Sequence, residues 1–128
     1  MKIRYVVVDD AAFIRELIKN ILSPQLAVFA GEAADGAEAL QVITETLPDL
    51  VFLDMVMPKM NGLETVLELK RIQPDLKVIG CSTLDNHNLV SQALSQGFDS
   101  YISKPFTKQQ ILFEIENLFP QLREALHE

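Results

Sequence analysis

The stretch KIRYVVVDDAAF, residues 2–13, sets an apolar run, Tyr5–Val8, directly before two adjacent carboxylates, Asp9 and Asp10. An apolar run without polar alternation is typical of a strand that is buried on both faces of a sheet. Two like charges about 4 Å apart near a protein surface repel each other by roughly 4 kcal/mol. Such a pair at the end of a buried strand indicates either a helix cap or a cation-binding site.

Apolar runs of this kind recur along the chain, and apolar residues at helical spacing fill the intervals between them. Strands are predicted at Tyr5–Val8, Leu26–Ala30, Leu50–Leu53, Lys77–Cys81 and Ser100–Ser103. Helices are predicted within residues 13–22, 37–47, 63–72, 89–94 and 111–122. The segment GEAADG, residues 31–36, is interpreted as a loop. Strict alternation of strands and helices predicts an α/β domain with a single five-stranded parallel sheet, right-handed crossovers and helices on both faces.

The composition fits one globular domain. The chain has 128 residues, of which 48% are hydrophobic and 23% charged, and this length suffices to close a single core. No apolar stretch approaches the ~20 residues of a membrane span, so we expect no membrane partner. The single Cys81 is expected to be a buried thiol, and these features together predict a cytoplasmic protein. The net charge of −7 argues against direct binding to nucleic acid, because the chain offers no excess of cations for phosphates.

The residues that finish the predicted strands are the candidate functional residues, because ligands of such sheets bind beyond the carboxyl ends of the strands. Taken singly, some have a structural explanation: Asp10 can cap the helix that begins near Ala11, and Ser82 can cap a helix near Asn86. A cap needs one carboxylate, however, whereas this edge of the sheet collects three. The set at the strand ends comprises Asp9, Asp10, Asp54, Ser82, Thr83, Lys104 and Pro105.

Phosphoryl transfer with Mg²⁺ is the chemistry that uses such a set. Magnesium is typically held by one or two carboxylates together with the oxygens of a phosphate. A carboxylate can itself attack phosphorus and form an aspartyl phosphate. The charge of the transferred group must be neutralised by metal and by a positioned cation, and Lys104 is the basic residue at a predicted strand end. The hydroxyl group of Ser82 can then bond a phosphoryl oxygen.

Several motifs, in this order and spacing, carry a resemblance to a known family. They are VVVDDAAF at residues 6–13, LVFLDMVMPKMNG at 50–62, CST at 81–83 and SYISKPF at 100–106. The chain resembles the receiver domain of two-component response regulators over essentially its whole length, 1–128, and is most similar to chemotaxis receivers of the CheY and CheB kind. The resemblance implies a flavodoxin-like (βα)5 fold with strand order 2-1-3-4-5. Residues 119–128 are then either an extended last helix or the start of a linker to an output domain.

The resemblance implies a Mg²⁺ site around a phosphoacceptor, with Mn²⁺ as a substitute. Asp54 corresponds to the phosphoacceptor and contributes to the metal site. Asp10 corresponds to a direct Mg²⁺ ligand, Asp9 to a ligand that acts largely through water, and Val56 to a residue whose backbone carbonyl is a further ligand. Val56 and Leu84 are apolar at positions that are often polar in the family.

The resemblance also implies a switch. Ser82 corresponds to the switch hydroxyl, and Tyr101 to the aromatic residue that moves with it. Lys104 corresponds to the lysine that contacts the phosphoryl group, and the family has a cis bond at the position of Pro105. Thr83 departs from the family, in which the residue after the switch hydroxyl is usually small, and its size can crowd the phosphoryl site or restrict Tyr101.

These assignments predict a signalling switch rather than an enzyme. A histidine kinase or phosphotransfer protein donates a phosphoryl group to Asp54, and the receiver assists its own phosphorylation and dephosphorylation. The new group, with a charge of about −2, draws Ser82 toward it and Tyr101 inward. This movement repacks the face formed by the fourth helix, the fifth strand and the last helix, where an output protein or effector domain binds.

Three alternatives stay open. An Asp-nucleophile phosphatase or phosphotransferase shares Asp54 and Mg²⁺, but Val56 stands where such an enzyme has a second acid. A nucleotide- or flavin-binding module shares the fold, but DDAAF lacks the glycine-rich turn that lets a phosphate approach the backbone. The chain also fits the receiver portion of a larger DNA-binding or enzymatic response regulator.

Overall fold

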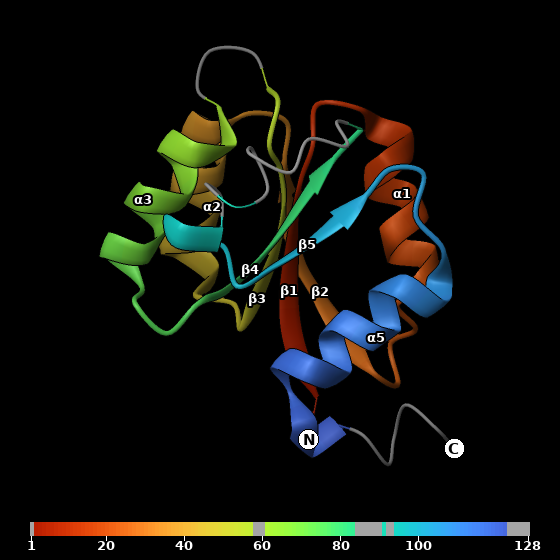
Figure 1. The fold of residues 1–128 in the computed structure, drawn as a ribbon. Helices are drawn as coiled ribbons and strands as arrows, with labels where there is room; N and C mark the ends of the chain where they lie inside the picture. Colours follow the sequence, from red (N-terminus) through yellow and green to blue (C-terminus); the bar gives the residue numbers. More distant parts are fainter. Residues whose placement is uncertain (1, 58–60, 84–90, 92–93, 123–128) are drawn as a thin grey trace.

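The computed structural model describes residues 2–57, 61–83, 91 and 94–122. In chain order the elements are β1 (Ile3–Val8), α1 (Ala12–Ile21), β2 (Ala27–Ala33), α2 (Gly36–Thr46), β3 (Leu50–Asp54), α3 (Gly62–Ile72), β4 (Lys77–Ser82), β5 (Ser100–Ser103), α5 (Lys108–Leu118) and the 3-10 helix η1 (Pro120–Leu122). A central sheet separates two layers of helices, with α1 and α5 on one side and α2 and α3 on the other (Figure 1). The predicted helices on both faces of the sheet are confirmed.

The five strands form one parallel sheet in the order β2-β1-β3-β4-β5, which confirms the predicted flavodoxin-like arrangement. The register aligns the carboxyl ends of the strands. Val8 of β1 lies opposite Leu53 of β3, and Ser82 of β4 lies opposite Ser103 of β5. The residues that follow these strands therefore emerge together at one side of the sheet, which we call the carboxyl edge.

Alternate side chains of the strands enter two separate cores. On β3, Leu50 and Phe52 pack with α1 and α5, whereas Val51 and Leu53 pack with α2 and α3. The helical side chains of the first core include Ile14, Ile18, Ile111 and Ile115, and those of the second include Ala39, Ile43, Val66 and Leu69. Because both faces of the central strands β1, β3 and β4 are covered, their buried stretches are continuous apolar runs. Cys81 of β4 is buried in the first core, as predicted.

Polar caps begin most of the described helices. Asp35 caps α2 and Asn61 caps α3, each by accepting a hydrogen bond from a backbone N–H three residues ahead, and Thr107 opens α5 with a capping box. In α1 the N-cap residue is Ala11, whose methyl group cannot accept a hydrogen bond. The interpretation of Asp10 as a helix cap is therefore wrong.

Two predicted boundaries are also wrong. β2 continues to Ala33, so residues 31–33 of the GEAADG segment are strand rather than loop, because they pair with the end of β1 beyond a register shift after Tyr5. The last helix ends at Leu118, since Pro120 has no N–H with which to continue it, and a 3-10 helix follows. Of the helix predicted within 89–94, positions 91 and 94 are helical, and the rest lies outside the described residues, as do 123–128. None of the helices in the described ranges is long and apolar enough to cross a membrane.

Candidate functional site

Three carboxylates meet at the carboxyl edge. One carboxylate oxygen from each of Asp9, Asp10 and Asp54 lies within 4.8 Å of the others. Asp9 and Asp54 are buried, with exposed fractions of 2% and 5%, whereas Asp10 is exposed. We call these three residues the acidic cluster. The structure thus brings together the acidic residues that the strand ends were predicted to collect.

Asp9 is held by contacts to three elements. Its backbone N–H donates to the carbonyl oxygen of Ala33 at 3.0 Å, which ties it to β2. Its Oδ1 atom accepts a hydrogen bond from the N–H of Ala11 at 2.9 Å, at the start of α1. Its Oδ2 atom accepts one from Nζ of Lys104 at 2.6 Å, in the segment that follows β5. The carboxylate of Asp9 is therefore fixed in orientation.

Asp54 is the last residue of β3, the central strand of the sheet. Its Oδ1 atom accepts a hydrogen bond from the N–H of Val56 at 3.1 Å, and its Oδ2 atom lies 3.6 Å from Nζ of Lys104. The chain returns close behind this residue, because a Cβ atom at Gly62 would lie 2.6 Å from Cα of Met55. Only glycine permits this approach, which lets α3 begin next to the Asp54 turn.

The electrostatics of the cluster are unbalanced. Burial, together with the charges of Asp9 and Asp10, raises the pKa of Asp54 to about 6, and the N–H of Val56 and the ammonium group of Lys104 offset this rise only in part. Burial alone lowers the pKa of Lys104, but the hydrogen bond to Asp9 and the charge of Asp54 outweigh it and raise the pKa. Lys104 therefore stays protonated at neutral pH. Among the described residues, the ammonium group of Lys104 is the one that contacts carboxylates of the cluster, those of Asp9 and Asp54. Together with this ammonium group, the three carboxylates carry a net negative charge.

The donor set of the acidic cluster fits a hard divalent cation. Carboxylate oxygens are the ligands that suit Mg²⁺ and Mn²⁺. The exposed side chain of Asp10 leaves one side of the cluster open to solvent, and Mg²⁺ commonly retains several of its waters. Burial is the larger cause of the raised pKa of Asp54, and positive charge added here offsets the smaller contribution from the charges of Asp9 and Asp10.

The predicted switch residues lie on the neighbouring strands β4 and β5. Ser82 ends β4 and is buried, whereas the next residue, Thr83, is exposed. The carbonyl oxygen of Ser82 accepts a hydrogen bond from the N–H of Lys104 at 2.7 Å, so the end of β4 is tied to the residue that reaches Asp54. The peptide bond between Lys104 and Pro105 is cis. Ser82 and Lys104 thus emerge side by side at the carboxyl edge.

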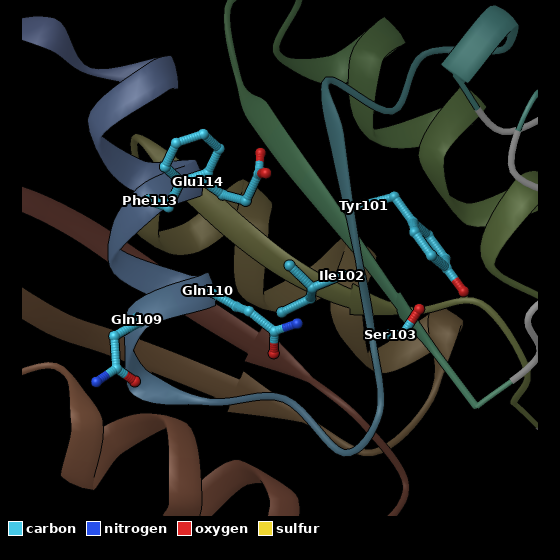
Figure 2. A pocket seen from close by; sticks show the side chains of 7 residues that line it. All are labelled: Tyr101, Ile102, Ser103, Gln109, Gln110, Phe113 and Glu114. Atoms are coloured by element: carbon cyan, nitrogen blue, oxygen red, sulfur yellow. The ribbon is translucent and has the colours of Figure 1, made fainter.

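Tyr101 lies at the edge of the sheet, where β5 and α5 border a groove of about 510 Å³. Figure 2 shows Tyr101 and Ser103 projecting from one side of β5 and Ile102 from the other, toward α5. Tyr101 is half-buried and packs against the core of α2 and α3. On the opposite wall of the groove, Phe113 of α5 is 61% exposed. This groove is the β5–α5 groove below.

A second groove, of about 430 Å³, lies directly beside the acidic cluster. Asp9, Asp10 and Lys104 form its polar end, and the rest of its lining is mostly apolar. Phe13 of α1, which borders it, is 71% exposed. The residues that line this α1 groove are Asp9, Asp10, Ala11, Phe13, Ile14, Leu17, Thr83, Lys104, Pro105 and Phe106.

Comparison with known proteins identifies the family. Residues 5–116 match the response regulator receiver domain. The chain belongs to this family. Receiver domains are phosphoacceptor signalling switches that bind Mg²⁺ at an acidic cluster and interact with histidine kinases and output partners. The acidic cluster of this receiver domain is a group that could hold such an ion.

Chemotaxis receivers are among the similar proteins. The receiver domain is 38% identical to the chemotaxis protein CheY of Thermotoga maritima over 109 residues, which cover 85% of this chain and 91% of that protein. It is 39% identical over 107 residues to a protein-glutamate methylesterase/protein-glutamine glutaminase of Pyrococcus horikoshii, covering 81% of this chain and 29% of that protein. The receiver is therefore CheY-like, as predicted.

Solved structures show the same fold. The CheY structure in the CheX-CheY-BeF3-Mg+2 complex from Borrelia burgdorferi superimposes with a TM-score of 0.87 at 28% identity, covering 91% of this chain and 89% of that chain. The receiver domain of NarL from Mycobacterium tuberculosis gives a TM-score of 0.84 at 34% identity, covering 91% and 94%. These likenesses support the assignment of the receiver fold.

Two residues next to the acidic cluster were missed by the sequence reasoning. Arg15 of α1 and Glu32 of β2 form an ion pair of 2.7 Å, and Arg15 also contacts the backbone of Asp9. Glu32 fell in the segment interpreted as a loop. Arg15 is the signal that could have revealed the pair, since it is the first cation after Asp9 in the sequence.

Proposed function

We propose that residues 1–128 form one receiver domain that accepts a phosphoryl group on Asp54 and uses it to switch partner binding. The observation that carries this proposal is the buried carboxylate of Asp54, which lies within the acidic cluster and 3.6 Å from the ammonium group of Lys104. With a pKa of about 6, Asp54 is mostly ionised at neutral pH and yet poorly solvated. Both properties suit a nucleophile. The buried free thiol of Cys81 fits a reducing compartment, and we place the protein in the cytoplasm.

The acidic cluster is the proposed Mg²⁺ site, with Mn²⁺ as a substitute. Asp10 and Asp54 are the proposed direct ligands, Asp9 acts largely through water, and the backbone carbonyl of Val56 completes the protein's contribution. When bound, the cation neutralises charge on the phosphoryl oxygens. Lys104, already held beside Asp9 and Asp54, supplies the second positive charge.

The proposed donor is a phosphohistidine of a histidine kinase or phosphotransfer protein. A carboxylate oxygen of Asp54 forms a bond to phosphorus while the P–N bond breaks, and the imidazole leaves with the electron pair and takes up a proton. Dephosphorylation follows when water attacks phosphorus and Asp54 leaves. The apolar α1 groove beside the cluster, bordered by the exposed Phe13, offers the donor protein a surface close to Asp54.

The proposed switch begins at Ser82 and ends at the β5–α5 groove. The hydroxyl group of Ser82 bonds a phosphoryl oxygen, and Tyr101 turns inward on the side of β5 that faces α2 and α3. Because Tyr101 lines the β5–α5 groove, its movement changes the surface that an output protein or effector domain contacts. The fourth helix of this face lies largely outside the described residues.

Phosphoramidate and Mg²⁺ provide the test, with intact-protein mass as the readout. We expect the mass to increase by one phosphoryl group and hydroxylamine to remove it, since it cleaves acyl phosphates. Asp54→Asn should stay unlabelled, whereas Asp75→Asn, in the exposed turn before β4, should label like the wild type.

Hydrogen exchange of the labelled protein then tests the switch. We expect altered exchange along β5 and α5 in the wild type and none in Asp54→Asn. Equal labelling of Asp54→Asn would refute the acceptor assignment, and unchanged exchange in a labelled wild type would refute the switch. Continuous turnover of a small phosphoester would instead establish an Asp-nucleophile phosphatase.

A further inference from the structure

Arg15 reaches back from α1 to the turn that carries two residues of the acidic cluster. Its Nη1 atom donates to the backbone carbonyl oxygen of Asp9 at 2.6 Å, and its Nε atom donates to Oε1 of Glu32 at 2.7 Å. The side chain of Arg15 is 18% exposed and that of Glu32 34% exposed. The two contacts are therefore partly shielded from water.

The contact with Asp9 holds a whole peptide unit. The carbonyl group of Asp9 and the N–H of Asp10 belong to one planar peptide, which does not rotate about its C–N bond. The N–H of Asp9 donates to the carbonyl oxygen of Ala33 in β2 at 3.0 Å. The backbone that leads into Asp10 is therefore held by β2 before Asp9 and by Arg15 after it. These contacts fix the backbone from which the side chains of Asp9 and Asp10 extend, whereas the N–H of Ala11 and the ammonium group of Lys104 hold the carboxylate of Asp9 directly.

Glu32 determines where the guanidinium group of Arg15 points. The extension of β2 places Glu32 opposite Val7 of β1, close to the end of that strand. The hydrogen bond from Arg15, together with one from Lys19, outweighs partial burial and lowers the pKa of Glu32, so this carboxylate is ionised at neutral pH. The donors of a guanidinium group are fixed in one plane, and the bond to Glu32 therefore orients the bond to Asp9.

We propose that Arg15 is a positioning residue for cation binding, anchored by Glu32, and that it sets the direction in which Asp9 and Asp10 present their carboxylates. This role rests on the Mg²⁺ site proposed above. Long-range electrostatics alone predicts the opposite effect, because removing a positive charge near the acidic cluster strengthens its attraction for cations. Positioning predicts weaker binding, since partners that orient metal ligands commonly account for about 10–100-fold in affinity. The sign of the change thus separates the two effects.

Calorimetric titration of the metal-free protein with Mg²⁺, without any phosphodonor, tests the role. We expect Arg15→Met to raise the Mg²⁺ dissociation constant at least about 10-fold. Lys19→Met is the matched control: Lys19 also pairs with Glu32, at 3.0 Å, but its described contacts do not include Asp9. It should bind Mg²⁺ as tightly as the wild type or more tightly. Urea unfolding in EDTA establishes that each variant is folded.

Glu32→Gln gives a second, milder test that does not depend on the folding of Arg15→Met; because losing the negative charge of Glu32 by itself weakens cation binding, unchanged or tighter binding is the decisive outcome. It should weaken Mg²⁺ binding by a smaller factor, and the double variant Arg15→Met/Glu32→Gln should bind no more weakly than Arg15→Met alone, because the two residues act as one unit. At saturating Mg²⁺, the rate of phosphorylation by phosphoramidate should stay near that of the wild type. The Mg²⁺ concentration for half the maximal rate should rise as the dissociation constant does.

The outcomes separate this role from the proposed function. If the wild type binds Mg²⁺ and both Arg15→Met and Glu32→Gln bind it equally well or more tightly, the positioning role of Arg15 is wrong. The assignment of Asp54 as the phosphoacceptor is not affected by this outcome. A lower rate at saturating Mg²⁺ with an unchanged dissociation constant would also overturn it. A wild-type protein that binds no Mg²⁺ would show that the proposed metal site itself is wrong.

Discussion

Replacing Asp54 by asparagine removes a buried charge from the acidic cluster at almost constant side-chain size. In the metal-free protein, burial and the charges of Asp9 and Asp10 raise the pKa of Asp54 from 3.8 to about 6. At about 1.36 kcal/mol per pH unit, this rise destabilises the folded protein by at most about 3 kcal/mol once Asp54 is ionised. We therefore expect the free energy of unfolding of Asp54→Asn to exceed that of the wild type by about 1–3 kcal/mol at about pH 8. The melting temperature should rise by roughly 3–10 °C.

The sign of the pH dependence follows from the same pKa. Well below pH 3.8, Asp54 is protonated in the folded and the unfolded protein, and its ionisation does not affect stability. As the pH rises to about 6, the unfolded chain releases this proton first, so the wild type loses stability relative to the variant. Above this window the difference is constant. The advantage of Asp54→Asn should therefore appear between pH 3.8 and about 6.

Urea unfolding in EDTA, followed by far-UV circular dichroism at several pH values, measures this difference. Asp75→Asn is the control, because it removes one carboxylate from an exposed turn away from the carboxyl edge. Its stability should stay within about 0.5 kcal/mol of the wild type at each pH. If the advantage of Asp54→Asn were the same at about pH 4 and about pH 8, burial and like charges would not be what perturbs Asp54.

Three further predictions follow from the same site. Mg²⁺ at 100 times its dissociation constant should raise the free energy of unfolding by about 2.7 kcal/mol, and Asp10→Asn should remove most of this gain; an unchanged melting curve contradicts the proposed site. Lys104→Met should lower the free energy of unfolding of the metal-free protein by about 3 kcal/mol, because it leaves the buried Asp9 carboxylate without its ion-pair partner. A decrease below about 1 kcal/mol in urea unfolding contradicts this role of Lys104. Val56→Asn should shorten the lifetime of the aspartyl phosphate, because the side chain of Val56, 57% exposed beside Asp54, cannot orient water. Equal or slower loss of phosphate by the variant, timed after removal of the phosphodonor, contradicts this role of Val56.

The layout of the fold could be predicted from the sequence because it depends on patterns that are local. Continuous apolar runs identify strands covered on both faces, and their alternation with helices places the ends of the strands at one edge. That layout places Asp9, Asp10 and Asp54 at the same edge, and the pairing of β1 with β3 brings them together there. The strand order came only with the resemblance, since crossover lengths do not determine which strands are neighbours.

The extension of β2 could not be predicted, because glycine, glutamate and alanine have low strand propensity. Residues 31–33 are strand because β1 pairs with them, and tertiary pairing of this kind overrides local preference. The same error hid Glu32 and its ion pair with Arg15. The sequence also could not predict which carboxylate pairs with Lys104, whose Nζ atom lies 2.6 Å from Oδ2 of Asp9 but 3.6 Å from Oδ2 of Asp54. Differences of about one ångström in a cluster depend on packing that no spacing of residues encodes.

The attachment site of the phosphoryl group is the most direct test of the central claim. Borohydride reduces an aspartyl phosphate to homoserine, so the modified residue can be read by tandem mass spectrometry after proteolysis. For protein treated with phosphoramidate and Mg²⁺, we predict conversion of Asp54 and of no other aspartate. Conversion at Asp9 or Asp10 instead, or labelled protein in which Asp54 stays intact, would contradict the assignment of Asp54 as the phosphoacceptor.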